Sequence, residues 1–158
     1  MRRKTFSRAS YEQNDQTGKD ACIDIFSNLF GYTHIPYEKE LYKKGDLIMD
    51  DPKGIERLIE VEVKRVGWTD GNFKYDSLHF AYKPDSESYA FASFNKELDN
   101  VFLAKKTWVI QERNLITKDT YNRYTGEKTY NEPFYEIKVS KCKHYRKNAK
   151  GVWEIVKK

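Results

Sequence analysis

The sequence is poor in cysteine, and its few potential metal-binding side chains are scattered. Cys22 and Cys142 lie far apart, and neither belongs to a paired ligand motif. His34, His79 and His144 are equally dispersed, so the ligand spacing of a zinc site is missing. Cys22 stands among apolar residues of a predicted helix and is expected in the core. We therefore expect neither a zinc site nor a need for disulfides.

Long apolar runs, internal repeats and low-complexity segments are also lacking. No run approaches the roughly 20 residues that span a bilayer, and the basic residues 1 to 6 are not followed by the apolar stretch of a signal peptide. A chain of 158 residues is long enough to bury one core. We expect a single cytoplasmic domain over residues 1 to 158, without a membrane partner and with residues 1 to 13 as a basic arm.

Positive charge gathers at the two ends of the chain. The net charge is +5, and residues 138 to 158 contain Glu154 as their single acidic residue. Basic side chains of this segment that we expect to contact nucleic acid are Lys141, Lys143, Arg146, Lys147 and Lys150. The alternative is a solvated edge strand whose lysines discourage aggregation.

A helix is predicted over residues 17 to 30. Its apolar residues recur at helical spacing, and Gly31 is placed to end it. Asp20 and Asp24 share the polar stripe of this helix, because residues four apart lie on one face. Either carboxylate is therefore available on the side that does not pack.

A β-hairpin is predicted next. Residues 45 to 49 and 55 to 66 have strand character, and residues 50 to 54 between them are rich in Asp, Pro and Gly. The second strand alternates strictly, with apolar side chains on one face and charged ones on the other. The apolar set is Ile59, Val61 and Val63, and the charged set is Glu60, Glu62 and Lys64.

The remainder of the chain is predicted to be largely strand. The strands expected are 78 to 82, 88 to 94, 101 to 104, 107 to 110, 134 to 139 and 151 to 156. Residues 114 to 131 are predicted as a polar loop with a turn at 124 to 127. One helix packed on a mixed, mostly antiparallel sheet is an α+β fold.

Three side chains of the hairpin can carry chemistry. Asp46 belongs to the first strand and Glu62 with Lys64 to the second, so paired strands can bring them to one patch. Two nearby carboxylates stay ionised readily only with a cation between them. Oxygen ligands suit Mg²⁺, with Mn²⁺ as the alternative. A metal bound there can activate water for phosphodiester cleavage, and Lys64 can orient that water.

The same residues resemble a known motif. Gly45-Asp46, fifteen intervening residues and Glu62-Val63-Lys64 look like the PD-(D/E)xK motif of a nuclease superfamily that includes type II restriction enzymes and phage resolvases. The resemblance covers about residues 17 to 67. It implies a restriction-endonuclease-like core, magnesium-dependent hydrolysis of DNA, and metal ligation by Asp46 and Glu62. Counting back from Gly31 as in the phage resolvases, it also implies Asp20, rather than Asp24, as a further catalytic and metal-binding carboxylate.

The resemblance also implies a biological setting and leaves alternatives. It implies a DNA endonuclease in a bacterial or phage-infected cell, acting on duplex or branched DNA, with a homodimer as the expected assembly. A non-catalytic nucleic-acid-binding module is the alternative, followed by a phage structural or host-interaction protein that keeps the fold without the chemistry. Gly45 stands where the motif has proline. The helix that the family places after the Glu-x-Lys strand is not evident in residues 69 to 87.

Residues after the motif can contact the substrate. His79 and Lys83 can reach a bound phosphate, His79 more readily as a DNA contact or an ordinary strand residue than as a general base. Trp68, Phe73 and Tyr75 stand in a predicted loop, where they can stack against an unpaired base or cover the sheet edge. The sequence does not separate these two roles.

Overall fold

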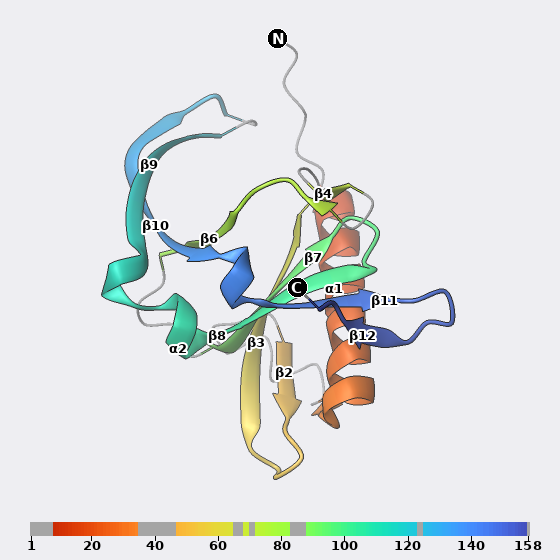
Figure 1. Cartoon of the computed structure of the whole chain (residues 1–158). Coiled ribbons are helices and arrows are strands. Elements are labelled where there is room, and N and C mark those ends of the chain that lie inside the picture. Colours follow the sequence, from red (N-terminus) through yellow and green to blue (C-terminus); the bar gives the residue numbers. More distant parts are fainter. Residues whose placement is uncertain are drawn as a thin grey trace.

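A computed structural model describes residues 8–34, 47–64, 68–69, 72–82, 88–122 and 125–157, with side chains from Gln16 onward except that of Thr69. Within these residues, helix α1 (Arg8–Phe30) packs on a curled seven-stranded sheet, which is accompanied by smaller sheets of three and two strands (Figure 1). This confirms the predicted N-terminal helix on a mixed, mostly antiparallel sheet. The described chain is mostly β with few helices.

The large sheet carries the predicted hairpin. Its strand order is β1 (Thr33–His34), β2 (Leu47–Asp50), β3 (Glu56–Lys64), β7 (Ser88–Asn95), β8 (Asn100–Lys105), β11 (Lys143–Lys147) and β12 (Trp153–Ile155). Strands β3 and β7 run parallel, and the other described neighbours run antiparallel. The hairpin turn is built on Asp51, whose Oδ1 accepts the backbone N–H groups of Ile55 and Lys53, each at 2.9 Å. These bonds, that of Ile55 first, hold the pKa of Asp51 below its usual value.

One face of the sheet is covered by α1. The fully buried Cys22 and Ile25 of the helix pack with Ile59 of β3, and Val61 and Val63 lie against the same cluster, as the alternation predicted. Burying side chains of this size stabilises the fold by about 1.5–3 kcal/mol each. At Gly18 the helix comes so close to β3 that an added Cβ would lie 2.8 Å from Val63 Cγ2.

The opposite face is covered by the two smaller sheets. These are β4 (Trp68–Thr69) with β5 (Asn72–Phe73), and β6 (Ser77–Ala81) with β10 (Lys128–Lys138) and β9 (Leu115–Tyr121). Leu78, Phe80 and Ile137 of the three-stranded sheet are buried against Phe91 and Phe102 of the large sheet. The other face of the three-stranded sheet carries His79, Lys118 and Glu136 beside Phe134, and its β9–β10 hairpin rises beside the body and bends at its tip back toward the side of α1 (Figure 1).

The prediction of a loop over residues 114 to 131 is wrong except for its turn, where Gly126 N–H donates to the carbonyl oxygen of Asn122. The segment is occupied by β9, by the beginning of β10 and by the end of a 3-10 turn, η2 (Glu112–Asn114). Along β9 the residues alternate between exposed and half-buried, so neither face is strongly apolar. Such a strand lacks the apolar alternation on which strand prediction depends.

The strand predicted over residues 107 to 110 is also wrong. The segment forms a short helix, α2 (Lys106–Val109), in which Val109 is buried. Asn114 Nδ2 donates to the carbonyl oxygens of Trp108 at 2.7 Å and Val109 at 3.1 Å, which satisfies two groups that the helix end leaves open. Aromatic and β-branched residues favour strands, and tertiary contacts override that preference here.

Two further boundaries differ from the prediction. Helix α1 begins at Arg8, nine residues before the predicted start, so residues 8 to 13 are helical instead of an arm. Residues 8 to 16 include few apolar side chains, so the helical spacing of apolar residues that predicted the rest of the helix is absent there. Strand β11 was missed because its residues are mostly basic, and a second 3-10 turn, η3 (Val139–Lys141), precedes it.

Candidate functional site

Glu62 and Lys64 lie side by side on the face of β3 that points away from α1. Lys64 Nζ donates to Glu62 Oε1 at 2.9 Å. The lysine side chain is 19% exposed and the glutamate side chain 44%. The two residues are adjacent because alternate residues of a strand share a face, as the sequence predicted.

A third residue of this group comes from the neighbouring strand. The parallel register of β3 and β7 places Ser93 opposite Glu62. The buried Ser93 donates from Oγ to Glu62 Oε2 at 3.2 Å. Sequence reasoning missed Ser93; the available signal was one hydroxyl in the apolar run Tyr89 to Phe94. With both oxygens engaged by donors, the carboxylate is held in one orientation and still has lone pairs to offer.

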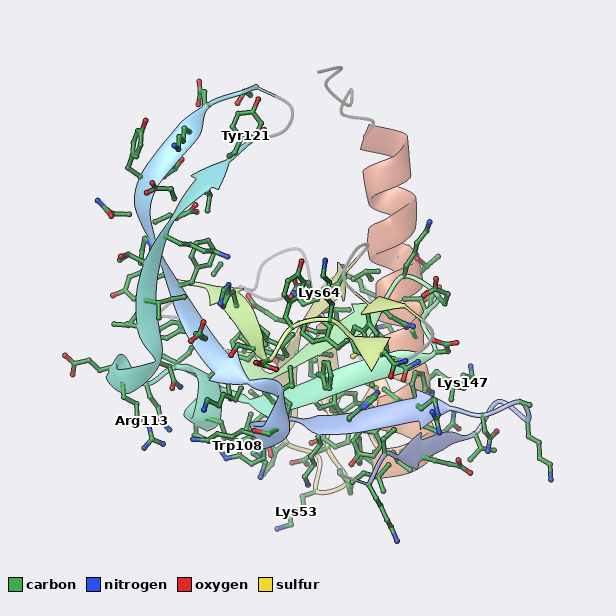
Figure 2. The ribbon with its side chains drawn as sticks, turned by 45° about the horizontal axis from the view of Figure 1, so that its top comes forward. Lys53, Lys64, Trp108, Arg113, Tyr121 and Lys147 are labelled. Atoms are coloured by element: carbon green, nitrogen blue, oxygen red, sulfur yellow. The ribbon has the colours of Figure 1, made fainter. Side chains whose placement is uncertain are left out.

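These side chains line a pocket of about 660 Å³ between the large sheet and the three-stranded sheet. Figure 2 shows Lys64 between the large sheet and the curved β9–β10 hairpin. The lining residues are Glu62, Lys64, Phe73, Tyr75, Asp76, Ser77, His79, Lys118, Phe134 and Glu136. Its volume falls within the range of about 300–1,000 Å³ that is usual for ligand pockets.

The opposite wall of this pocket carries a second polar group. His79 Nε2 lies 2.7 Å from Glu136 Oε2, and Lys118 Nζ lies 2.8 Å from His79 Nδ1. Strand pairing creates the first contact, because His79 of β6 stands opposite Glu136 of β10. Lys118 Nζ also lies 4.5 Å above the Phe134 ring. On the same strands Thr120 Oγ1 donates to Glu132.

Two predicted site residues, Asp46 and Lys83, lie outside the described residues. Leu47, which follows Asp46 in the sequence, pairs with Ile59 of β3. Asp20 is exposed and accepts a hydrogen bond from Gln16 Nε2 at 2.9 Å. Because α1 covers the Val61 and Val63 face, the sheet separates Asp20 from Glu62. The structure therefore does not bring Asp20 to the group formed by Glu62 and Lys64.

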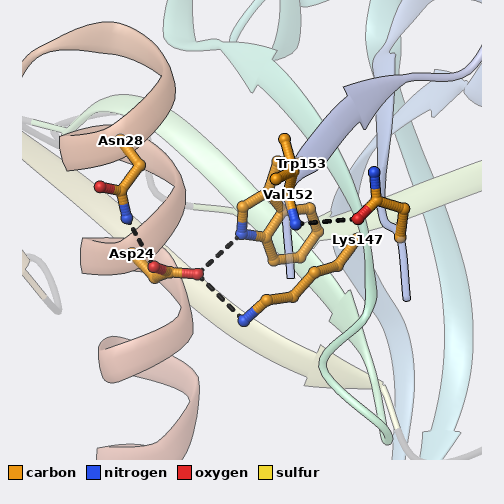
Figure 3. A network of polar contacts seen from close by, with 6 residues as sticks. Asp24, Asn28, Lys147, Val152 and Trp153 are labelled. Carbon is orange, nitrogen blue, oxygen red and sulfur yellow. Dashed lines mark hydrogen bonds and ion pairs between the residues drawn. The ribbon is translucent and has the colours of Figure 1, made fainter. Parts of the chain in front are cut away.

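Asp24, the other helical carboxylate, binds the C-terminal hairpin (Figure 3). Its Oδ2 accepts from Trp153 Nε1 at 2.9 Å and from Lys147 Nζ at 3.1 Å, and its Oδ1 accepts from Asn28 Nδ2 at 2.7 Å. Burial raises the pKa of Asp24, but these donors outweigh it and the net pKa is lowered. Asp24 thus ties α1 to β11 and β12.

The predicted basic contacts do not form one patch. Lys143 and Lys147 share the helix-side face of β11 with Tyr145, and Lys147 is paired with Asp24. Arg146, exposed, lies on the opposite face, since its neighbour His144 packs on Phe102. Lys141 in η3 and Lys150 in the β11–β12 turn are exposed. Their role in nucleic-acid binding stays a prediction.

Two of the three loop aromatics cover the sheet, as one of the two predicted roles requires, and stacking on a base stays a prediction for the third. Trp68 is buried and stacks on Phe102 with ring centroids 4.6 Å apart, and Phe73 meets both rings edge-on. These two cover the sheet. Tyr75 is 54% exposed and lines the pocket, so its ring is accessible to a ligand.

Carboxylate oxygen is the donor type that Mg²⁺ prefers, and Glu62 supplies it in this pocket. Within the described part of the chain, no group of three His, Cys, Asp or Glu side chains is placed to hold a metal ion. Of the two carboxylates predicted to bind a metal, Glu62 lies in this pocket, and Asp46 lies outside the described part. The donor chemistry fits the ion.

Neither the scan against protein-family models nor the searches of curated proteins and solved structures found a match to this chain. Among the described helices, none combines the length and the apolar character needed to cross a membrane. Function is therefore inferred from the geometry of the pocket and from the motif resemblance.

Proposed function

We propose that this protein is a divalent-metal-dependent DNA endonuclease of the PD-(D/E)xK type. The observation that supports the proposal most is the Lys64–Glu62 ion pair, whose 2.9 Å contact faces a pocket of about 660 Å³. An exposed surface pair contributes only about 0.2–1 kcal/mol to stability. Stability of that size does not require the half-exposed Glu62 carboxylate to be held by two donors at a concave site, and binding or chemistry explains this arrangement better.

Each side chain has a role that its atoms permit. Glu62 and Asp46 are the proposed ligands of Mg²⁺, or of Mn²⁺ as the alternative. When bound, the ion supplies a Lewis acid for the phosphate and lowers the pKa of water. Lys64 has only hydrogens to donate, so it orients the water through an oxygen lone pair and stabilises negative charge that develops on the phosphate. The water oxygen bonds to phosphorus and releases a proton to bulk water, the bond to the leaving sugar oxygen breaks, and that oxygen takes up a proton from bulk water.

The finer fold assignment belongs to the same proposal. A helix followed by a hairpin whose second strand carries Glu62 and Lys64 supports a restriction-endonuclease-like core. One feature departs from the family. Between β3 and β7 the described residues 68–69 and 72–82 form short strands instead of a helix. One of these short strands, β6, forms part of a wall of the pocket.

Cleavage assays test the proposal directly. Supercoiled plasmid, linear duplex and branched duplex are incubated with the protein in Mg²⁺ or EDTA, beside Glu62→Gln and Lys64→Ala. We expect cleavage that requires Mg²⁺ and falls by about 10²-fold or more in either variant, since each removes a group that acts on the reacting phosphate. Glu56→Gln, at the far end of the same strand, is the matched control and keeps wild-type activity.

The same assays also distinguish the proposed endonuclease from the main alternative. A protein that binds these DNAs equally with and without Mg²⁺, and cuts none of them, is a non-catalytic nucleic-acid-binding module. Equal cleavage by the wild type, Glu62→Gln and Lys64→Ala would place the chemistry elsewhere and overturn the proposed site.

A further inference from the structure

The pocket wall opposite Glu62 carries a cation for which the proposed chemistry has no role. Lys118 projects from β9 into the pocket, where its Nζ contacts His79 Nδ1 at 2.8 Å and lies 4.5 Å from the centre of the Phe134 ring. Lys64 lines the same pocket from β3. Two ammonium groups therefore face one cavity from different sheets.

The contacts of Lys118 determine the hydrogens on His79. An ammonium group only donates, so His79 Nδ1 must accept and the ring hydrogen resides on Nε2. That hydrogen is donated to Glu136 Oε2, 2.7 Å away. In this tautomer Glu136 holds the ring so that Nδ1 accepts from Lys118. The glutamate acts on Lys118 through the imidazole.

This arrangement prepares Lys118 to bind an anion. A lysine side chain loses considerable rotamer freedom on binding, and His79 and Phe134 already restrict it here. One ammonium hydrogen is used on His79, and two remain for a ligand. The Lys118 ammonium group contacts the imidazole and is separated by it from the Glu136 carboxylate, so its remaining hydrogens can be donated to an anion in the pocket.

The other charges of the pocket locate the anion. The carboxylates of Glu62, Asp76 and Glu136 repel a phosphate. A phosphate is attracted to the positively charged side chains of the pocket lining. In the described lining these are Lys64 on one wall and Lys118 on the other. Lys64 is paired with Glu62 at the proposed cleavage point. Lys118 is not used by the proposed cleavage chemistry, so it is available to bind a second phosphate of the same polymer.

We propose that Lys118 binds a backbone phosphate of the DNA next to the one that is cleaved, and that His79 and Glu136 are its positioning residues. The inference rests on the proposed function, because it names the second wall of that same site. It makes the three-stranded sheet part of the substrate site, and it assigns a contact residue outside both basic ends of the chain.

Binding in EDTA tests this without cleavage. The affinity for a fluorescein-labelled DNA duplex is measured by anisotropy between about 50 and 200 mM salt. Lys118→Ala is expected to weaken binding about tenfold. It should also lower the salt slope by about 0.9, the effect of one lost phosphate contact on a duplex. Lys53→Ala, an exposed lysine in the β2–β3 turn at the far end of β3, changes neither quantity (Figure 2).

The positioning role has a different signature. His79→Ala keeps the Lys118 charge, so the salt slope stays at the wild-type value while affinity falls about two- to tenfold, the cost of ordering one long side chain. His79→Gln restores most of that loss, because its amide oxygen accepts and its amide nitrogen donates. Thermal unfolding verifies that each variant is folded.

The outcomes separate this inference from the proposed function. Wild-type affinity and slope in Lys118→Ala, or a wild-type protein that does not bind the duplex, overturns the inference. An unchanged slope in Lys118→Ala with general loss of affinity also overturns it. Loss of affinity and slope in Lys118→Ala, in a protein that never cuts DNA, supports the phosphate contact while the nuclease proposal fails.

Discussion

At the scale of single residues, the Glu62 carboxylate is oriented by donors from two strands. Lys64 reaches Oε1 from the same strand, and Ser93 reaches Oε2 from β7. Groups that orient a metal-binding carboxylate typically change metal affinity or activity by 10- to 100-fold when removed. The buried hydroxyl of Ser93 is therefore expected to matter for chemistry more than for folding.

Ser93→Ala tests this expectation. We expect the Mg²⁺-dependent cleavage rate to fall about tenfold or more, with a melting temperature close to that of the wild type because half-exposed Glu62 stays hydrated. The matched control is Ser88→Ala, an equally buried serine at the other end of β7, opposite Leu58. Equal losses of activity in the two variants would contradict an orienting role for Ser93.

At the scale of elements, the C-terminal hairpin depends on one carboxylate of α1. Asp24 accepts from Trp153 of β12 and Lys147 of β11, and Phe30 of the helix meets Tyr145 edge-on. These contacts join the beginning of the chain to its last strands. These contacts hold the edge of the large sheet against the helix. Asp24 and Lys147, which the sequence linked to the site, therefore have a structural role here.

The Asp24 contacts predict a pH dependence of stability. Because the folded-state pKa lies below the ordinary value of 3.8, the stabilisation is fully present above 3.8 and is lost as pH falls through the folded value. Asp24→Asn should therefore unfold more easily than wild type at neutral pH, by about 1 kcal/mol or less after solvent screening. The difference should disappear in acid. Urea unfolding across this range measures it.

Asp20→Asn is the control for this measurement. Asp20 lies one turn earlier on the same helix, is exposed and accepts a hydrogen bond from Gln16. Its substitution should leave the acid dependence of unfolding unchanged. An acid dependence in Asp24→Asn as steep as that of the wild type would show that other carboxylates determine it.

At the scale of the whole molecule, each pocket wall rests on its own core cluster. The wall with Glu62 is backed by the cluster under α1, and the wall with His79 by the cluster under the three-stranded sheet. Ile25 belongs to the first cluster, and Ile137, which pairs with Leu78, belongs to the second. The distance between the walls therefore depends mainly on packing in the second cluster.

A matched pair of cavity mutations separates these contributions. Ile25→Ala and Ile137→Ala should each destabilise the protein by about 2–5 kcal/mol, because both side chains are buried. Ile137→Ala should in addition weaken DNA binding per folded molecule, since the wall that carries His79 and Lys118 can shift. Denaturant unfolding and anisotropy, compared at low temperature where both variants are folded, measure the two effects. Equal binding by the two variants would contradict a separate role for the second cluster.

Local signals predicted the parts of the fold that are built from neighbouring residues. The alternation of Ile59, Val61 and Val63 with charged residues indicated the buried and open faces of β3, and the Asp-rich turn indicated its hairpin. Polar strands gave no such signal. Strand β9 alternates between exposed and half-buried residues, and α2 has strand-like residues whose carbonyl groups are satisfied by Asn114.

The sequence by itself determined that Glu62 and Lys64 share one side of a strand, because a strand repeats every two residues. It did not determine what faces them. Ser93 is 31 positions from Glu62 and Glu136 is 57 positions from His79. Such pairs meet only through the parallel register of β3 with β7 and the pairing of β6 with β10. Tertiary structure therefore decided that Glu62 and Lys64 face a two-walled pocket, because strand pairing between distant segments is set by the packing of the whole chain.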